Sequence, residues 1–423
     1  MKELTVVYQG FGQAVPIGTL ADNGKGVLFE YTQQALAQRL ELSPLRLPLR
    51  LPAYPDRQGD YRSLHDVPGL IYDSLPDGWG YRLMHRRMRA RGLNPDALST
   101  LDHLACLGEH TMGALTYQPA QPDVMHTDDL TLLALAQEVQ AVQSDDGHEV
   151  LAEMARAGGS PGGARPKAMV HFNPQTLAMS TQAAQAPGGE PWLVKFAGTD
   201  DAPDSCVLEE LYARMARLAG LGVSDTRLFE LPQGQFAFGT RRFDRRDDPQ
   251  GNAGGHRVHV HTLAGLLHAN FQVPSVSYGD FFRVTRRLTR DQRELVKALK
   301  LATFNVLMNN RDDHAKNIAF VREADGRWLL APPYDLTYCP GYQGEHFMDM
   351  AGEGKAPART HVLAAAQEAG LPTTVATRAL DDVLEHLTPD VFTRMAKDLP
   401  LNAATQVMVH QAMMANHARL AGR

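Results

Sequence analysis

The segment 310–317, which reads Asn-Arg-Asp-Asp-His-Ala-Lys-Asn, carries the clearest chemical pattern in the chain. Within it, Asp312 is followed five positions later by Asn317. This spacing is typical of phosphotransferase catalytic loops, where the aspartate orients or deprotonates the attacking hydroxyl and the asparagine oxygen binds Mg²⁺ beside the phosphates. The spacing also recurs by chance, so the argument depends on the residues around it.

The residues after Asn317 indicate where a second metal ligand lies. The apolar run 318–321 is followed by the hairpin-turn signal Asp325-Gly326 and by a second apolar run, 328–330. Strands rise ~3.3 Å per residue and pair ~4.8 Å apart, so an antiparallel return brings Asp335 within a few ångströms of Asn317. We therefore predict Asp335 as the second metal carboxylate.

A phosphotransferase also needs a cation for the nucleotide phosphates, and Lys195 lies inside the otherwise apolar strand 192–196. Alternation places Lys195 and Leu193 on one face of the strand and the three other side chains on the opposite face. An isolated lysine of this kind is more often an exposed edge residue, but the nearby Asp/Asn loop favours the nucleotide role. Its partner is expected on the following helix, where Glu209 and Glu210 both qualify and Glu209 is preferred.

The segment 160–167, Ser-Pro-Gly-Gly-Ala-Arg-Pro-Lys, predicts a loop of small residues whose amide N–H groups approach phosphate oxygens. It is neither a Walker A loop nor a GxGxxG fingerprint, and a surface turn is the alternative. Histidines 256, 259 and 261 suggest a metal hydrolase, but no HExxH pair accompanies them. The chain also lacks the GxSxG elbow of a serine hydrolase.

The pattern along the chain predicts the elements that position these residues. We expect short strands and turns over 1–60, and the prolines at 48, 52 and 55 favour an edge or linker path there. Further strands are predicted at 168–172, 192–196 and 235–243, and helices at 80–91, 130–142, 206–218 and 291–308. The helix at 80–91 is rich in arginine and is either a basic contact surface or a solvated face.

The composition limits the function classes. With 42 Lys and Arg against 48 Asp and Glu, the net charge of -6 excludes a protein that binds nucleic acid by its overall charge. The three cysteines are too far apart for a CxxC knuckle and argue against a disulfide framework. No apolar stretch approaches the ~18 residues of a membrane span, so we expect a soluble, cytoplasmic protein with no membrane contact.

Taken together, these motifs resemble the HipA family, the serine/threonine kinase toxins of bacterial type II toxin-antitoxin systems. The resemblance covers nearly the whole chain. Segment 160–167 looks like the family's phosphate-binding loop, 193–196 like its nucleotide-lysine strand and 242–245 like the segment after the adenine hinge. Segment 310–317 resembles the catalytic loop and 334–336 the metal motif, while 73–78 and 107–115 resemble the N-terminal subdomain.

The resemblance implies an α+β, two-lobed protein-kinase-like fold with an N-terminal β-rich subdomain and a mostly helical C-terminal lobe. We expect the subdomain at 1–120, the nucleotide-binding part at 121–245, and the helical lobe with the catalytic and metal-binding motifs at 246–423.

The resemblance also implies ATP and Mg²⁺ as cofactors, with Asp312 as the catalytic aspartate and Asn317 and Asp335 as metal ligands. The candidate nucleotide-binding residues are Lys195, Gly162, Gly163, Ala164, Arg165, Lys167 and Glu209. Some family members phosphorylate a serine of their glycine-rich loop, which expels the loop and silences the kinase. Ser160 is the matching candidate for autophosphorylation here.

The implied partners are a small helix-turn-helix antitoxin of the HipB type, operator DNA reached mainly through that antitoxin, and a protein substrate such as an aminoacyl-tRNA synthetase. Two features depart from the family pattern: Asp313 stands where small residues are common, and the glycine-rich loop contains prolines. Two alternatives stay open. One is a small-molecule phosphotransferase of the aminoglycoside or sugar type, and the other is a non-enzymatic co-repressor scaffold that acts with a DNA-binding antitoxin.

Overall fold

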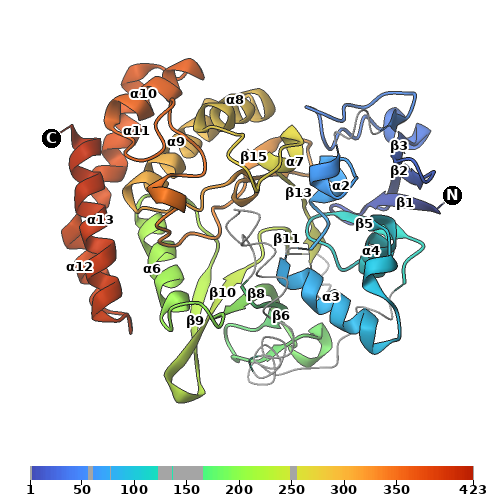
Figure 1. The fold of residues 1–423 in the computed structure, drawn as a ribbon, viewed down its shortest axis with the longest axis horizontal. Coiled ribbons are helices and arrows are strands. Elements are labelled where there is room, and N and C mark those ends of the chain that lie inside the picture. The colour runs from blue at the N-terminus through green and yellow to red at the C-terminus, as the bar shows by residue number, and fades with distance from the viewer. Residues whose placement is uncertain are drawn as a thin grey trace.

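The structure, a computed structural model, describes residues 2–55, 61–76, 78–121, 136, 165–247 and 255–422. The described residues of 2–121, which we call the N-terminal unit, contain a five-stranded antiparallel sheet in the order β4-β3-β2-β1-β5 (Figure 1). Its strands are β1 Lys2–Tyr8, β2 Val15–Asp22, β3 Val27–Tyr31, β4 Tyr54–Pro55 and β5 Leu115–Gln118. The proline-rich path to β4 accordingly ends in an edge strand.

Helices cover the N-terminal sheet and shield its apolar face. They are α1 Gln33–Ala37, α2 Gly69–Tyr72, α3 Gly78–Ala90 and α4 Thr100–Leu107. Helix α4 begins at a capping box formed by Ser99 and Asp102, and six of its eight residues are buried. Helix α3, predicted at 80–91, buries Trp79, Met84 and Met88, while its arginines are half-buried or exposed.

A second five-stranded antiparallel sheet, in the order β7-β6-β8-β10-β9, follows the N-terminal unit. Its strands are β6 Lys167–Phe172, β7 Met179–Ser180, β8 Glu190–Phe196, β9 Thr226–Leu231 and β10 Gln235–Arg241. Helix α6, Ser205–Leu218, packs against β9 and β10. The predicted strands and helix of this region are therefore confirmed, although β10 ends two residues before the predicted boundary.

The C-terminal part is mostly helical, with α9 packed in the middle of the largest core (Figure 1). Its helices are α7 Leu263–Leu267, α8 Tyr278–Thr289, α9 Gln292–Leu307, α10 Arg359–Glu368, α11 Thr373–His386, α12 Pro389–Lys397 and α13 Ala403–Ala421. Helix α9 confirms the helix predicted at 291–308. A small sheet, β13 His259–Thr262, β14 Ala319–Arg322 and β15 Trp328–Leu330, stands beside these helices, and β11 Arg245–Arg246 pairs with β12 His256–Arg257.

Short 3₁₀ helices complete the described elements: η1 Arg62–Leu64, η2 Pro95–Ala97, η4 Ala183–Gln185, η5 Pro232–Gly234, η6 Ala315–Asn317 and η7 Tyr342–Gly344. The predicted helix at 130–142 lies outside the described residues apart from residue 136. The domain boundaries at 120 and 245 stay predictions.

The N-terminal unit packs closely on the C-terminal part. Helices α2 and α7 approach each other so tightly that a Cβ atom on Gly69 would lie 2.0 Å from the carbonyl oxygen of Gly265. Only glycine permits this backbone approach. The contact brings the segment after α2 against the start of α7, beside the site described below.

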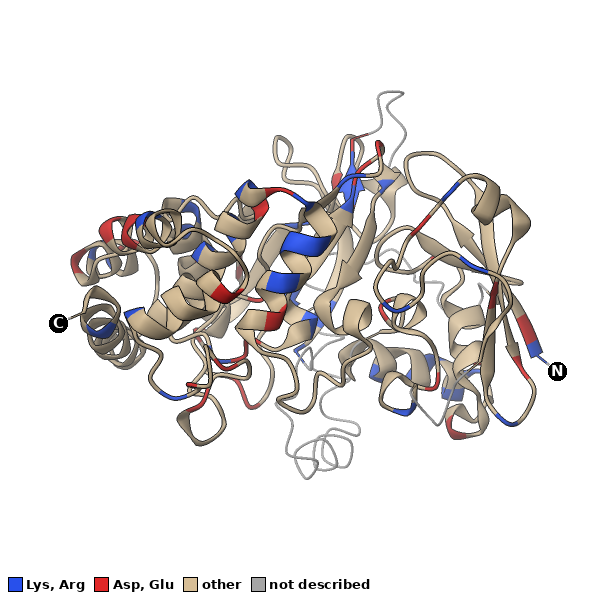
Figure 2. Cartoon of the chain, turned by 90° about the horizontal axis from the view of Figure 1, so that it is seen from above, with Lys and Arg blue, Asp and Glu red and all other residues tan. Residues whose placement is uncertain are grey.

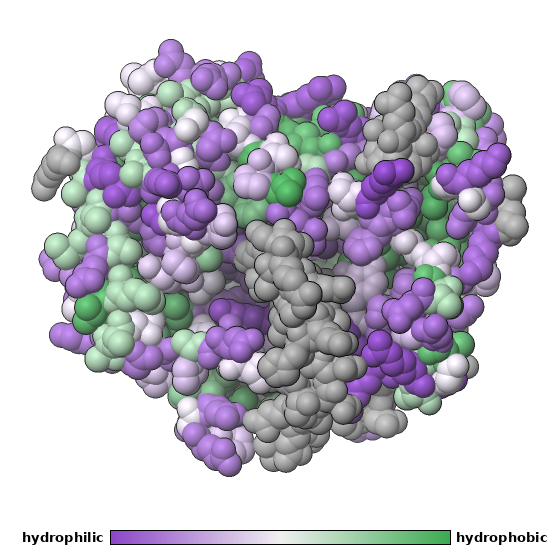
Figure 3. Space-filling model, viewed as in Figure 1, coloured by the Kyte–Doolittle hydropathy of each residue, from purple (hydrophilic) through white to green (hydrophobic). Residues whose placement is uncertain are grey.

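Charged and hydrophobic side chains are distributed differently over the surface. Seen from above, basic and acidic residues are interspersed along the chain (Figure 2). Hydrophobic side chains gather near the edge formed by α12 and α13 (Figure 3), and on α13 Val407, Met408 and Met414 are exposed. Every helix in the described part of the chain is too short or too polar to span a bilayer.

Candidate active site

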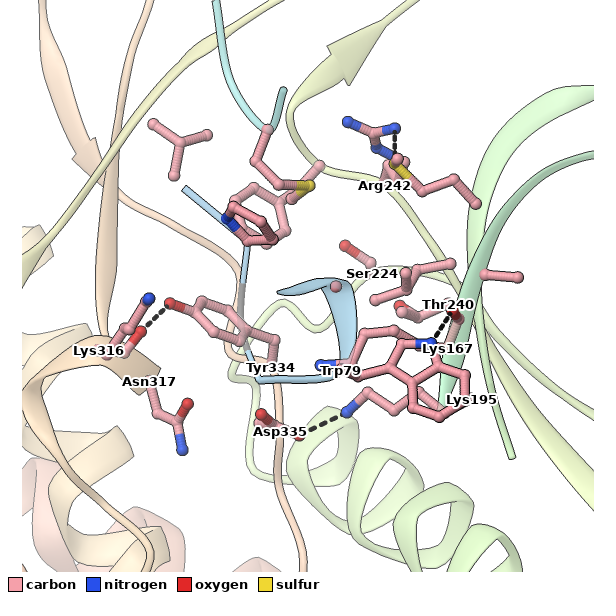
Figure 4. A pocket seen from close by; sticks show the side chains of 18 of the residues that line it. Trp79, Lys167, Lys195, Ser224, Thr240, Arg242, Lys316, Asn317, Tyr334 and Asp335 are labelled. Atoms are coloured by element: carbon pink, nitrogen blue, oxygen red, sulfur yellow. Dashed lines mark hydrogen bonds and ion pairs between the residues drawn. The ribbon is translucent and has the colours of Figure 1, made fainter. Parts of the chain in front are cut away.

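A cavity of about 510 Å³ lies where the second sheet, the C-terminal part and the N-terminal unit meet. One end is lined by residues singled out in the sequence: Lys167, Lys195, Glu209, Asn317 and Asp335. These side chains come from β6, β8, α6 and the two ends of the β14–β15 hairpin (Figure 4). The fold thus brings together residues that are up to 168 positions apart, from 167 to 335.

Lys195 projects from β8 into the cavity, while Trp192, Val194 and Phe196 pack into the core on the other face of the strand. Its ammonium group donates to Glu209 and, at 2.5 Å, to Oδ1 of Asp335. Burial alone lowers the pKa of a lysine, but the charges of Asp335 and Glu209 outweigh it and raise the pKa of Lys195 above its usual value. Lys195 is therefore held as a cation.

The two candidate partners on α6, Glu209 and Glu210, make different contacts in the structure. Glu209 contacts Lys195, whereas Glu210 accepts a hydrogen bond of 2.7 Å from Nε of Arg214, one turn along the same helix. The contact thus lies on Glu209, as preferred from the sequence. Its functional role stays a prediction.

Asp335 follows β15 and lies at the cavity wall with a left-handed backbone, φ 58°. Burial alone would raise the pKa of its carboxyl, but the charges of Lys195 and Lys167 hold that pKa well below the usual range. The preceding Tyr334 stacks on Phe243 and donates a hydrogen bond of 2.7 Å to the carbonyl of Lys316. The charges of Lys195 and Lys167 therefore keep Asp335 ionised, and the contact of Tyr334 holds this segment beside the predicted catalytic loop.

The predicted catalytic loop is closed by its own asparagine. Nδ2 of Asn317 donates to the backbone oxygen of Asp312 at 2.8 Å, which leaves the amide oxygen of Asn317 for another ligand. The hairpin pairs Phe320 with Leu330, so Asn317 and Asp335 stand at its two ends, before β14 and after β15. Asp312 itself is not among the lining residues, and its side chain is 22% exposed.

The residues present suit Mg²⁺. The amide oxygen of Asn317 and the ionised carboxylate of Asp335 are hard oxygen donors, and protein sites for Mg²⁺ commonly use one or two such ligands together with phosphates and water. Among the described residues, no group of three or more His, Cys, Asp or Glu side chains is arranged to hold a metal by itself. Asn317 and Asp335 are therefore the residues here that could hold a Mg²⁺ ion.

The glycine-rich loop is only partly described. Ser160, Gly162, Gly163 and Ala164 lie outside the described residues, and their roles stay predictions. Arg165 pairs with Asp201 at 3.1 Å and lies 3.6 Å from Glu209. Lys167 pairs directly with Lys195 across β6 and β8 and lines the cavity. Two cations from the end of the loop therefore flank the Lys195–Glu209 pair.

The N-terminal unit supplies a wall of the cavity that residue spacing alone did not reveal. Trp79 of α3 lines the cavity and donates from its indole N–H to the backbone oxygen of Lys167 at 2.9 Å (Figure 4). Asp73 also lines it and accepts two hydrogen bonds of 2.7 Å from the backbone and hydroxyl of Thr262. The only sequence signal for this wall was the resemblance of 73–78 to the family's N-terminal subdomain.

The histidines that suggested a metal hydrolase have protein partners instead. His259 hydrogen-bonds the backbone oxygen of Leu42 at 2.9 Å. His261 donates to Asp73 at 2.5 Å and accepts from Ser43 at 2.9 Å, an order that resembles a hydrolase triad. Ser43 is 0% exposed, however, so no substrate can reach its hydroxyl. This chain of contacts fastens the N-terminal unit to β13.

Asp313, the departure from the family pattern, is a fully buried structural carboxylate. It accepts hydrogen bonds from the Tyr278 hydroxyl (2.6 Å), Nδ1 of His346 (2.7 Å) and the backbone N–H of Phe347 (2.7 Å). These contacts fasten the predicted catalytic loop to α8 and to the segment after the metal motif. Sequence reasoning missed this role because all three donors are distant along the chain.

Comparison with known proteins agrees with this geometry. The family model described as the HipA-like C-terminal domain matches residues 159–391, and the HipA N-terminal domain matches residues 8–118. The first match alone covers more than half of the 423 residues. The chain belongs to the HipA family. The fold is accordingly the two-lobed, kinase-like fold expected from the resemblance.

Individual relatives of this HipA-family chain are distant. HipA in the complex of HipA, HipB and operator DNA from Shewanella oneidensis MR-1 superimposes with a TM-score of 0.71 over 99% of this chain and 97% of that one, at 21% identity. "Putative kinase Y4mE" of Sinorhizobium fredii is 28% identical over 159 residues, which span 36% of each protein. The proinflammatory kinase CtkA of Helicobacter pylori gives a TM-score of 0.43 at 12% identity, over 59% of this chain and 93% of that one.

Proposed function

We propose that this HipA-family protein is an ATP- and Mg²⁺-dependent kinase that phosphorylates a serine or threonine hydroxyl of a protein. The observation that carries the proposal is the convergence of Lys195, Glu209, Asn317 and Asp335 on one cavity, with Asn317 hydrogen-bonded to the backbone oxygen of Asp312. Each role required for phosphoryl transfer has a residue of suitable chemistry at this place.

The reaction depends on positioning and charge neutralisation. Lys195, fixed by Glu209, binds phosphate oxygens, and Asn317 and Asp335 hold the metal. A bound Mg²⁺ neutralises charge on the phosphates during transfer. Asp312 orients the substrate hydroxyl and accepts its proton as the new phosphoester bond forms and the bond to the leaving ADP breaks. Phe243 and Tyr334, stacked at the same cavity, supply an aromatic wall for the adenine.

We further propose that the protein is the toxin of a toxin-antitoxin module in the cytoplasm. Its membership of the HipA family and its likeness to a HipA that was solved with HipB and operator DNA support this proposal. The partner is then a HipB-like helix-turn-helix antitoxin, with DNA contacted mainly through it. An aminoacyl-tRNA synthetase is the proposed substrate, and Ser160 the proposed autophosphorylation site.

Incubation with radiolabelled ATP and Mg²⁺, followed by mass spectrometry of labelled protein, tests the kinase proposal. We expect label in the wild type, including Ser160, and none in Asp312→Ala, whose fold should be intact. Asp325→Ala, at an exposed hairpin turn, is the matched control and should stay active. An active Asp312→Ala variant would remove Asp312 from its role, and label found only on a metabolite would indicate a small-molecule phosphotransferase. Failure to bind ATP with Mg²⁺ would support the scaffold alternative.

A further inference from the structure

His314 is buried in the predicted catalytic loop without an ordinary partner. Its side chain is 3% exposed, and its ring lies between Phe271, at 5.1 Å between centroids, and Phe347, at 5.7 Å. Neither ring nitrogen has a hydrogen-bond partner among the residues that the structure describes. An imidazole always carries at least one N–H, and leaving such a buried group unsatisfied is costly. Buried polar groups without a hydrogen-bond partner are rare in native structures, and the His314 ring is such a group.

Neighbouring buried histidines show what a structural histidine does in this fold. His261 hydrogen-bonds both Asp73 and Ser43, and His346 hydrogen-bonds Asp313. A residue that only filled the space between Phe271 and Phe347 would fit it better as phenylalanine, since no polar group would then be buried. His314 differs from both neighbours. Its ring lies between Phe271 and Phe347, and neither of its nitrogens has a hydrogen-bond partner among the described residues.

The polar group that His314 faces is the predicted catalytic aspartate. Nε2 of His314 lies 3.8 Å from Oδ1 of Asp312, slightly beyond hydrogen-bond distance. His314 lines the cavity, whereas Asp312 is not among the lining residues. Catalytic hydrogen bonds are often long in ligand-free structures and shorten when the substrates bind.

We propose that His314 is a positioning residue for Asp312: its Nε2–H donates to Oδ1, so that Oδ2 is turned toward the substrate hydroxyl. The inference rests on the proposed kinase function. It assigns to the histidine no proton transfer and no contact with the metal. Phe271 and Phe347 hold the imidazole ring of His314 in place, and the ring in turn holds the carboxylate of Asp312.

Two variants of His314 separate positioning from packing. His314→Phe keeps the aromatic volume and removes the donor, whereas His314→Gln keeps a donor. We expect His314→Phe to lower kcat about 10- to 100-fold, as loss of an orienting partner commonly does, with little change in the KM for ATP. His314→Gln should recover part of that loss. Equal losses in both variants, or a change in KM alone, would contradict the proposal.

A double-mutant cycle with Asp312→Asn identifies the route of the effect. If His314 acts through Asp312, His314→Phe should produce no further loss of residual activity in the Asp312→Asn background. A full additional loss there would show that the histidine acts independently and would overturn the inference.

A spectroscopic test keeps this inference separate from the proposed function. In ¹⁵N-histidine-labelled protein with Mg²⁺ and a non-hydrolysable ATP analogue, the Nε2–H resonance of His314, assigned by its absence in His314→Phe, should shift in Asp312→Asn. An unchanged resonance would refute the contact even in an active kinase. If the resonance shifts in Asp312→Asn but the wild type has no kinase activity, the kinase proposal is refuted and the contact is kept.

Discussion

At the residue scale, Lys195 determines how the site is held together. Its ammonium group stands between Glu209 and Asp335, so one cation bridges two carboxylates. The side chains of Lys195 and Glu209 are 7% and 3% exposed, which makes this a buried pair. Replacing one member of a buried pair leaves an uncompensated charge. This lowers stability more than breaking an exposed pair does.

We therefore predict that Lys195→Met both abolishes catalysis and destabilises the fold. Loss of the phosphate-binding cation should lower kcat about 10²-fold or more, and loss of the charge that bridges Glu209 and Asp335 should lower the free energy of unfolding by about 3–5 kcal/mol. Kinase assays and urea unfolding measure the two effects. Lys355→Met is the matched control, because Lys355 and its partner Glu345 are 61% and 52% exposed. A Lys195→Met variant as stable as wild type would contradict the argument.

The residue types also determined how much of the site could be predicted. Lys195 was predictable because it is the one charge in an apolar strand, and Asn317 and Asp335 because a short hairpin fixes their register. Asp73 and Trp79 were not predictable from spacing, since their partners Thr262 and Lys167 are far away in the sequence. Local pattern cannot indicate which distant backbone groups need a partner.

At the element scale, Asp313 fixes the orientation of the catalytic loop. Its carboxylate receives hydrogen bonds from α8, through Tyr278, and from the segment that carries His346 and Phe347. Tyr278 also accepts a hydrogen bond of 3.0 Å from Asn305 of α9. Helices α8 and α9 and the segment at 346–347 are thus joined at the residue next to Asp312.

Asp313→Ala is predicted to be severely destabilising. It removes the acceptor for several buried donors at once, and each unsatisfied donor costs about 1–3 kcal/mol, so the free energy of unfolding should fall by about 3 kcal/mol or more. Chemical denaturation measures this loss. Asp247→Ala, at a side chain that is 85% exposed, should change stability by less than about 0.5 kcal/mol. Comparable effects of the two substitutions would show that Asp313 does not hold the loop.

At the scale of the whole molecule, the N-terminal unit is joined to the kinase-like part through histidines that are buried or half-buried. Burial lowers the pKa of His259 to about 3 and that of His268 to about 4, with the neighbouring His261 adding to both shifts. His259 contacts the backbone of Leu42, and His268 packs edge-on against Tyr61. The sequence predicted the unit but not this junction, because period and propensity describe elements one at a time.

Stability should therefore fall on acidification. Unfolding restores an ordinary histidine pKa of about 6.5, so below that pH the unfolded chain binds protons that the folded chain does not. Each of the two histidines then removes about 1.4 kcal/mol per pH unit as the pH falls from about 6.5 toward its folded value. His268→Asn tests this, because asparagine does not titrate and tolerates the left-handed backbone at 268, φ 54°. Urea unfolding between pH 7.5 and 5 should show a shallower pH dependence in the variant, and identical slopes would mean that His268 takes up its proton in the folded chain as readily as in the unfolded chain.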